Sequence, residues 1–271
     1  MKLSNTKTLA PLSESIEEVR AWFNGELGQQ LLAAEKRVMD RVMPTLFGYH
    51  MLQVGVHAET DLLEHASGGH KFVLMPRIEM GMDDAAVIGR AEELPLANGC
   101  IDAVVLHHAL DFAQSPHQVL REAARVLRPG GKLVVVGFNP FSFWGLSRLV
   151  RQRKGQVPWR GHFLSVGRLQ DWLTLLELKQ DRACSGFYRP PIESARWRNR
   201  LEFVERWGER YHTNNGAFLV MVASKETLAP TSVGRSWRRR LVFPVAKPTA
   251  SRAGRQVARQ SPPDSDSARE A

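Results

Sequence analysis

Residues 101–138 read IDAVVLHHALDFAQSPHQVLREAARVLRPGGKLVVVGF, and this stretch decides the fold. Residues 101–106 are apolar apart from Asp102, which predicts a buried strand. Ser115-Pro116 is typical of a helix start, because serine caps a helix and proline fits its first turn. The helix is expected to end before Pro129-Gly130-Gly131, and the apolar run at 131–138 predicts a second buried strand. Strand, helix and strand in this order indicate a parallel α/β sheet.

The same alternation of strands and helices extends to both sides of this stretch. Residues 14–43 have apolar positions at helical spacing, with breaks at Gly25 and Gly28 and an end at Pro44. Further strands are predicted at 50–55, 71–75, 85–88, 179–188 and 217–224, and further helices at 60–66, 141–153, 165–176 and 195–208. Right-handed crossovers make this a doubly wound, mainly parallel seven-stranded sheet. We therefore predict a helical segment at 1–47, an α/β domain at 48–227 and a basic, disordered tail at 228–271.

Composition and charge restrict the possible classes of function. The net charge is +9, but the tail from Ala229 onward holds nine Lys and Arg against three Asp and Glu, so the folded part is only mildly basic. The basic run at 235–240 could weakly contact RNA or an anionic membrane surface, or be a solvated tail. No apolar run is long enough for a transmembrane helix, and residues 1–11 lack the apolar core of a secretory signal. The two cysteines form no disulfide framework, so we expect a cytoplasmic protein.

Three linked motifs carry a family resemblance: GRAEELPLANG at 89–99, IDAVVLHHALDF at 101–112 and RVLRPGG at 125–131. Together they resemble the type 11-like, class I S-adenosylmethionine-dependent methyltransferases, and the resemblance covers residues 48–140. It implies a Rossmann-like fold, S-adenosylmethionine as the methyl donor and a small-molecule methyl acceptor. Ligands of such sheets bind at the carboxyl ends of the strands.

The sequence departs from the family where the donor is bound. Of the glycine-rich turn after the first strand only Gly55 is kept, with Gln53 at the position of an acid and His57 at that of a second glycine. The second strand ends at Met75 without the family's ribose-binding acid, and Arg90 stands where the family has an aspartate. The resemblance places these residues at the donor: Gly55, Val56, His57, Met75, Arg90, Ala91, Glu92 and His107. Two functions stay open: a methyltransferase with an altered donor site, or a non-catalytic binding or regulatory protein of the same fold.

His107 and His108 follow the fourth predicted strand, where the resemblance places the methyl group. Either imidazole could act as general base for an oxygen or nitrogen nucleophile, because histidine titrates near neutral pH. Alternatively, one ring packs under the sheet and the other only shapes the pocket. His57 and His70 have no diagnostic ligand spacing, so no metal site is expected. Aromatic residues after the fifth strand, such as Trp144, are expected to cover the acceptor pocket.

Overall fold

The computed structural model describes residues 12–56, 62–78, 85–152, 155–192, 208 and 215–226 of the 271-residue chain. All of these residues belong to one compact unit, Met1–Ala229. The predicted helix at 195–208, apart from Gly208, and the predicted disordered tail lie outside the described residues.

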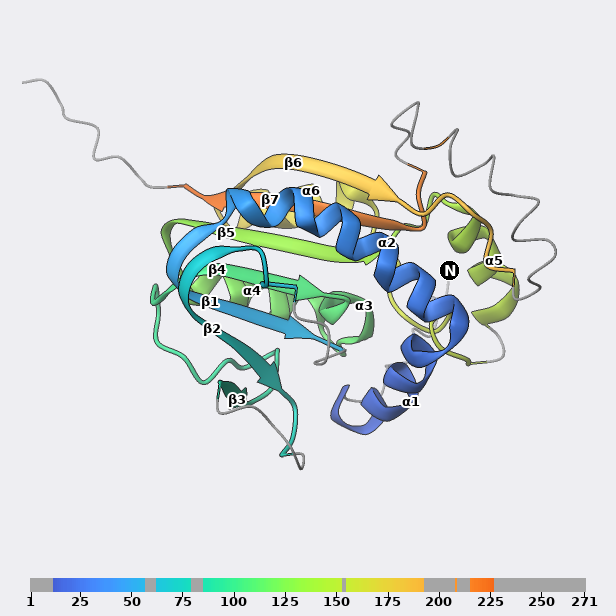
Figure 1. Cartoon of the computed structure of the whole chain (residues 1–271), viewed down its shortest axis with the longest axis horizontal. Coiled ribbons are helices and arrows are strands. Elements are labelled where there is room, and N and C mark those ends of the chain that lie inside the picture. Colours follow the sequence, from blue (N-terminus) through green and yellow to red (C-terminus); the bar gives the residue numbers. More distant parts are fainter. Residues whose placement is uncertain are drawn as a thin grey trace, which may run out of the picture. The chain divides into compact units, whose positions relative to one another are not determined.

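Seven strands form a single sheet in the order β3-β2-β1-β4-β5-β7-β6 (Figure 1). The strands are β1 Phe47–Gly55, β2 Ser67–Met75, β3 Ala86–Ile88, β4 Ile101–His107, β5 Leu127–Phe138, β6 Leu178–Gly186 and β7 Phe218–Lys225. From β3 to β5 all neighbours are parallel, whereas β7 is antiparallel to both β5 and β6. The prediction of a mainly parallel seven-stranded sheet is therefore confirmed. The parallel strands share one carboxyl edge, where ligands of such sheets bind.

Helices cover both faces of the sheet, with α2 in front of it and α4 and α6 behind it in the view of Figure 1. The helices are α1 Leu12–Asn24, α2 Glu26–Val42, α3 Ala109–Phe112, α4 Pro116–Val126, α5 Phe143–Arg151 and α6 Val166–Leu175, with a 3-10 turn η1 at Met43–Thr45. One apolar core includes Leu31 of α2 and Val105 of β4, and the other includes Leu120 of α4 and Val104 of β4. Successive strand residues point to opposite faces, so β4 is buried on both.

Two local predictions are wrong. Residues 62–66, the described part of the expected helix at 60–66, form a turn that leads directly into β2. Pro129-Gly130-Gly131 does not precede the next strand but lies within β5, where Gly130 has a φ of +79° that glycine adopts without strain. Leu62 is nevertheless buried in the same core as α2, so this turn still contributes to the cover of the sheet.

Asp102 joins the beginnings of β1 and β4. Its side chain is buried, and Oδ2 accepts hydrogen bonds from the backbone N–H of Tyr49 at 2.7 Å and of His50 at 2.8 Å. Oδ1 forms an ion pair with Arg128. A Cβ atom at Gly48 would lie 2.2 Å from the Cβ of Asp102, so the close approach requires glycine there. The acid that opens the fourth strand therefore has an architectural role at the amino edge of the sheet.

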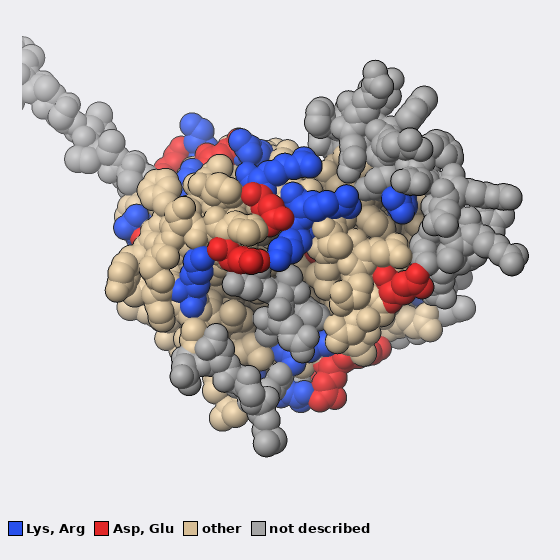
Figure 2. Space-filling view, viewed as in Figure 1, with Lys and Arg blue, Asp and Glu red and all other residues tan. Residues whose placement is uncertain are grey.

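The described surface carries charges of both signs. On the face with α2, Figure 2 shows Lys and Arg interspersed with Asp and Glu. Lys36, for example, pairs with Glu64 at 2.8 Å. This mixture gives no electrostatic support to nucleic-acid binding by that face. The basic run at 235–240 is not among the described residues, so its contact with RNA or an anionic surface stays a prediction.

Among the described helices, none is both long enough and apolar enough to cross a membrane.

Candidate functional site

The carboxyl edge of the sheet brings several of the predicted donor residues together. Gly55 is the register partner of His107, and Met75 ends the neighbouring strand β2. A Cβ atom at Gly55 would lie 3.3 Å from the Cβ of His107, so glycine lets the two strand ends approach closely. Val56 is buried, and its carbonyl accepts a 3.4 Å hydrogen bond from Nε of Arg20 in α1. The predicted donor residue His57 lies outside the described residues.

The residues after β3 divide into a buried and an exposed part. Ala91 is buried, and its contact with the donor stays a prediction. The Arg90 side chain is 61% exposed, and its Nε lies 4.0 Å from a carboxylate oxygen of Glu92. The Arg90 side chain therefore faces solvent in this structure, and its contact with the donor stays a prediction.

Two side chains of α4 hold the loop that contains Ala91. Glu122 accepts a 3.0 Å hydrogen bond from the backbone N–H of Leu94, and Arg125 donates to the carbonyls of Leu94 and Leu96 at 3.0 and 2.8 Å. Arg125 also pairs with Glu122 at 2.8 Å, and this hydrogen bond lowers the pKa of Glu122. The arginine of the RVLRPGG motif thus fixes the loop that the resemblance assigns to the donor.

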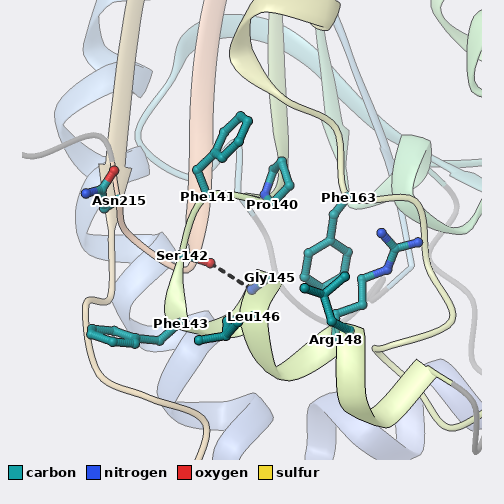
Figure 3. A pocket seen from close by; sticks show the side chains of 10 residues that line it. Pro140, Phe141, Ser142, Phe143, Gly145, Leu146, Arg148, Phe163 and Asn215 are labelled. Carbon is teal, nitrogen blue, oxygen red and sulfur yellow. Dashed lines mark hydrogen bonds between the residues drawn. The ribbon is translucent and has the colours of Figure 1, made fainter.

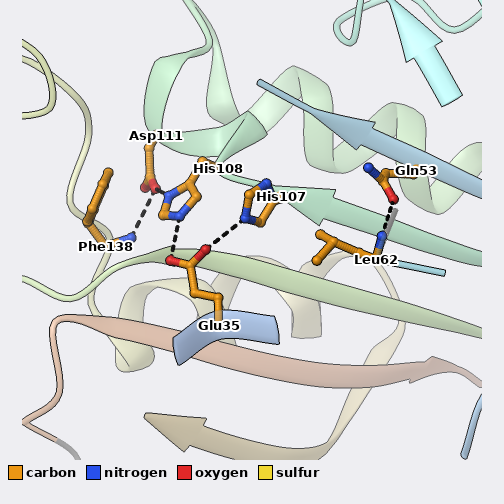
Figure 4. Close-up of polar contacts among 7 residues, drawn as sticks. All are labelled: Glu35, Gln53, Leu62, His107, His108, Asp111 and Phe138. Atoms are coloured by element: carbon orange, nitrogen blue, oxygen red, sulfur yellow. Dashed lines mark hydrogen bonds and ion pairs between the residues drawn. The ribbon is translucent and has the colours of Figure 1, made fainter. Parts of the chain in front are cut away.

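A buried polar cluster lies where α2 crosses the end of β4 (Figure 4). The Glu35 carboxylate faces both imidazoles, with Oε2 2.8 Å from Nε2 of His107 and Oε1 2.9 Å from Nε2 of His108. Nδ1 of His108 lies 2.7 Å from Oδ2 of Asp111, which also accepts a 2.9 Å hydrogen bond from the backbone N–H of Phe138. The side chains of Glu35, His107 and His108 are 0% exposed. We call these four residues, Glu35, His107, His108 and Asp111, the Glu35 cluster.

The charges within the Glu35 cluster depend on one another. Burial disfavours the carboxylate of Glu35, but the charge of His108 and the hydrogen bonds of both imidazoles outweigh it and lower the pKa of Glu35. Burial likewise disfavours protonated His108, and the two neighbouring carboxylates outweigh it and raise the pKa of His108. His108 itself has a φ of +51°, a left-handed conformation that side chains rarely adopt. The backbone is therefore held in an uncommon shape that aims this ring at Glu35.

Sequence reasoning singled out His107 and His108 of the Glu35 cluster and missed Glu35. A signal was present, because Glu35 stands four residues after Leu31 and four before Met39, on the apolar stripe of α2. An acid at a buried helix position usually has a specific partner. Catalysis by His107 or His108 stays a prediction, and in the described conformation α2 encloses both rings.

Comparison with known proteins identifies the domain. Residues 54–135 match the family model for a methyltransferase domain. The crystal structure of an S-adenosylmethionine-dependent methyltransferase from Thermotoga maritima superposes with a TM-score of 0.59 at 19% identity, covering 79% of this chain and 98% of that one. Residues 54–135 therefore match a methyltransferase domain, and the sheet has the class I methyltransferase fold.

Two relatives of the methyltransferase domain are similar beyond the matched region. YafS of Escherichia coli is 28% identical over 172 residues, which cover 63% of this chain and 69% of YafS. MJ1123 of Methanocaldococcus jannaschii is 27% identical over 139 residues, which cover 51% of this chain and 63% of that protein. The similar region spans less than two thirds of MJ1123, so this similarity does not show that the two proteins share an activity.

The methyltransferase domain has a pocket of about 400 Å³ beyond the carboxyl end of β5 (Figure 3). Its walls include Phe141, Phe143 and Leu146, which are 71%, 51% and 61% exposed. Arg148 lies over the Phe163 ring at 5.0 Å, and burial lowers its pKa. The pocket thus combines apolar walls with one incompletely solvated guanidinium group.

Aromatic contacts connect this pocket to the Glu35 cluster. The ring of Phe138 lies 4.4 Å from that of His108 and stacks at 4.9 Å on Phe163, a pocket residue. Trp144 is fully buried and stacks on Phe138 at 5.9 Å. Trp144 therefore belongs to the core beneath the pocket, whereas phenylalanines of the same segment line the pocket itself.

Proposed function

We propose that this protein transfers a methyl group from S-adenosylmethionine to a small apolar acceptor bound in the pocket beyond β5. The observation that carries the proposal is that this pocket lies beside the carboxyl edge of a class I methyltransferase sheet. Ligands of doubly wound sheets bind at that edge, and a pocket of about 400 Å³ is within the usual range for small molecules. Acceptor and donor would then meet near the ends of β4 and β5.

The residues at the carboxyl edge of the sheet supply some, but not all, of the contacts expected for S-adenosylmethionine. Gly55, Val56, Met75, Ala91 and Glu92 would hold it, with the loop at 91–94 already fixed by α4. After β2, the described residues 76–78 provide no carboxylate for the ribose hydroxyls, and Glu79, Asp83 and Asp84 lie outside the described residues. Because a missing charged contact costs about 1–3 kcal/mol, the donor is expected to bind more weakly than in relatives with the full motif.

The pocket determines which acceptor is favoured. S-adenosylmethionine supplies a methyl group on a positively charged sulfur, and its transfer needs a nucleophile held in line with that methyl group. Phe141, Phe143 and Leu146 would bind an apolar ring or chain, and Arg148 would bind an oxygen or anionic group on it. The chain's own contribution is therefore positioning, by apolar contact and one charged anchor.

Titration calorimetry of the full chain with S-adenosylmethionine and S-adenosylhomocysteine tests the donor half of the proposal. Binding on the order of micromolar is expected for at least one of them. If no heat of binding is measured up to millimolar donor, methyltransferase activity is contradicted. The alternative, a non-catalytic binding or regulatory role for the same fold, is then favoured. That alternative is supported by Gln53, by Arg90 and by the enclosed histidines, all of which depart from a standard donor site.

A pair of leucine variants tests the acceptor half. Leu146→Glu places a charge in the apolar pocket and is expected to abolish methyl transfer to apolar acceptors, while donor binding is kept. Leu175→Glu is the matched control, since Leu175 is 82% exposed on α6 and does not line the pocket. If both variants methylate acceptors from a radiolabelled donor as well as the wild type, the pocket is not the acceptor site.

A further inference from the structure

The Glu35 cluster holds two buried carboxylates, so it needs a compensating positive charge, from a protonated imidazole or from a metal ion. A neutral imidazole has one N–H group, yet His108 has a carboxylate oxygen at each nitrogen, 2.7 Å from Nδ1 and 2.9 Å from Nε2. Oδ2 of Asp111 already accepts from the N–H of Phe138, so a neutral His108 would donate its Nδ1–H to Asp111 and turn the lone pair of Nε2 to Glu35. Two lone pairs at this distance repel each other, so a proton or a metal ion is required between them.

We propose that Glu35, His107 and His108 form a structural binding site for a divalent transition-metal ion. One ligand atom from each residue lies within 4.8 Å of the others, and all three side chains are buried. The two carboxylate oxygens each face one imidazole Nε2, so four possible ligand atoms converge (Figure 4). Zinc takes nitrogen at about 2.0–2.1 Å and oxygen at about 2.0–2.2 Å, which four atoms in this arrangement can supply after small movements.

Charge and the surrounding hydrogen bonds both support a metal ion. Glu35 and Asp111 contribute two negative charges in the fully buried cluster, and a divalent ion with two neutral imidazoles would balance them. Asp111 accepts from Nδ1 of His108 and so orients the ring, an arrangement that accompanies most histidine ligands of metals. A Cβ atom at Gly137 would lie 3.1 Å from Oδ1 of Asp111, so glycine makes room for this carboxylate.

The donor atoms select the kind of ion. Two imidazole nitrogens with a carboxylate suit zinc, cobalt, iron or nickel, whereas magnesium and calcium prefer oxygen alone. The ligands are 0% exposed, which leaves no open position for a substrate, so the ion would be structural. It would join α2 to the end of β4 and thereby hold the N-terminal helices on the sheet. The inference is independent of methyl transfer.

Metal analysis of the full chain, purified without a polyhistidine tag, tests the site. About one equivalent of zinc is expected by mass spectrometry, and cobalt added after chelation is expected to give the visible absorption of a tetrahedral site. Zinc should also raise the thermal midpoint of the chelated protein. A wild-type protein that neither retains zinc nor gives the cobalt spectrum would overturn the proposal and show that protons fill the cluster.

Variants locate the metal and distinguish it from adventitious binding. Glu35→Gln keeps the side-chain volume and is expected to weaken cobalt binding more than tenfold, while Glu64→Gln, at an exposed glutamate 2.8 Å from Lys36, is expected to change nothing. Asp111→Asn should weaken it about 10–100-fold by releasing His108. Cobalt affinity that is unchanged in both cluster variants would overturn the assignment. If Glu35→Gln does not fold by circular dichroism, Asp111→Asn and the wild-type spectrum decide.

Discussion

The side-chain Oε1 of Gln53 accepts a 3.1 Å hydrogen bond from the backbone N–H of Leu62. Gln53 lies inside β1, and the bond reaches across the loop that joins β1 to the turn before β2. Related methyltransferases are expected to have an acid at this position, and the amide accepts from the loop without a negative charge. The side chain therefore ties β1 to Leu62, in the turn that precedes β2.

Replacing Gln53 with methionine keeps the side-chain volume and removes the acceptor. The buried N–H of Leu62 is then left without this partner, which is expected to lower the free energy of unfolding by about 1–3 kcal/mol. Gln170→Met is the control, because Gln170 bonds Gln180 at the exposed surface and its loss is expected to cost less than about 0.5 kcal/mol. Urea unfolding measures both changes, and equal effects would contradict a loop-closing role for Gln53.

Asp102→Ala removes the acceptor of two backbone N–H groups at the start of β1. We expect a loss of about 1–3 kcal/mol in the free energy of unfolding, because the acid is buried and both donors lose their partner. Asp181→Ala is the comparison, since the Asp181–Lys132 pair is partly exposed and such pairs contribute about 0–1 kcal/mol. Chemical denaturation of both variants measures the two losses in the free energy of unfolding. A smaller loss for Asp102→Ala than for Asp181→Ala would refute the architectural role.

Replacing glycine with alanine in the first turn of a helix is expected to change stability in opposite directions in α5 and α6. A Cβ atom at Gly145 of α5 would lie 1.9 Å from the carbonyl oxygen of Pro140, so Gly145→Ala must displace the helix start that forms the pocket wall. A loss of about 1–3 kcal/mol is expected. At Gly167 of α6 nothing lies within 4 Å, and Gly167→Ala should stabilise the protein by about 0.4–1 kcal/mol. Thermal midpoints that shift in the same direction for both variants would count against this packing.

The stability contributed by Glu122 should depend on pH. Its hydrogen bond with Arg125 lowers the pKa of Glu122 in the folded protein below the ordinary 4.5. The stabilisation by Glu122 is therefore complete above pH 4.5. It is lost as the pH falls through the folded-state pKa. Glu122→Gln is therefore expected to be less stable than the wild type at about pH 7, with a difference that narrows below about pH 4. Urea midpoints across this range measure it, with exposed Glu14→Gln as control; a gap that is constant with pH would disprove the linkage.

Strand β4 was predictable because burial on both faces leaves a continuous apolar run. Val104 and Val105 point into different cores, so neither could be polar. The start of β1 was predicted three residues late, because Phe47 and Tyr49 are 68% and 69% exposed and are held by backbone pairing with β2 rather than by burial. Backbone pairing of exposed residues produces no alternation of apolar and polar residues in the sequence.

The Glu35 cluster could be predicted only in part. His107, His108 and Asp111 are neighbours in the sequence and follow a recognisable strand. Glu35 approaches them only because α2 folds over the sheet, and a pairing across 72 residues is not encoded in local spacing. An acid on an apolar helix face indicates that some partner exists, but it does not say which one.

The position of β7 between β5 and β6 has a consequence for synthesis on the ribosome. Strand β6 is made before β7 but pairs with β7 alone, so it emerges without a partner strand. Only when residues 218–225 have been made can β5, β7 and β6 form one continuous ladder of hydrogen bonds. Until then one edge of β5 and both edges of β6 lack a partner strand, and unpaired strand edges are templates for aggregation. Emergence of β7, rather than the earlier emergence of the parallel strands, is therefore the event that completes the sheet.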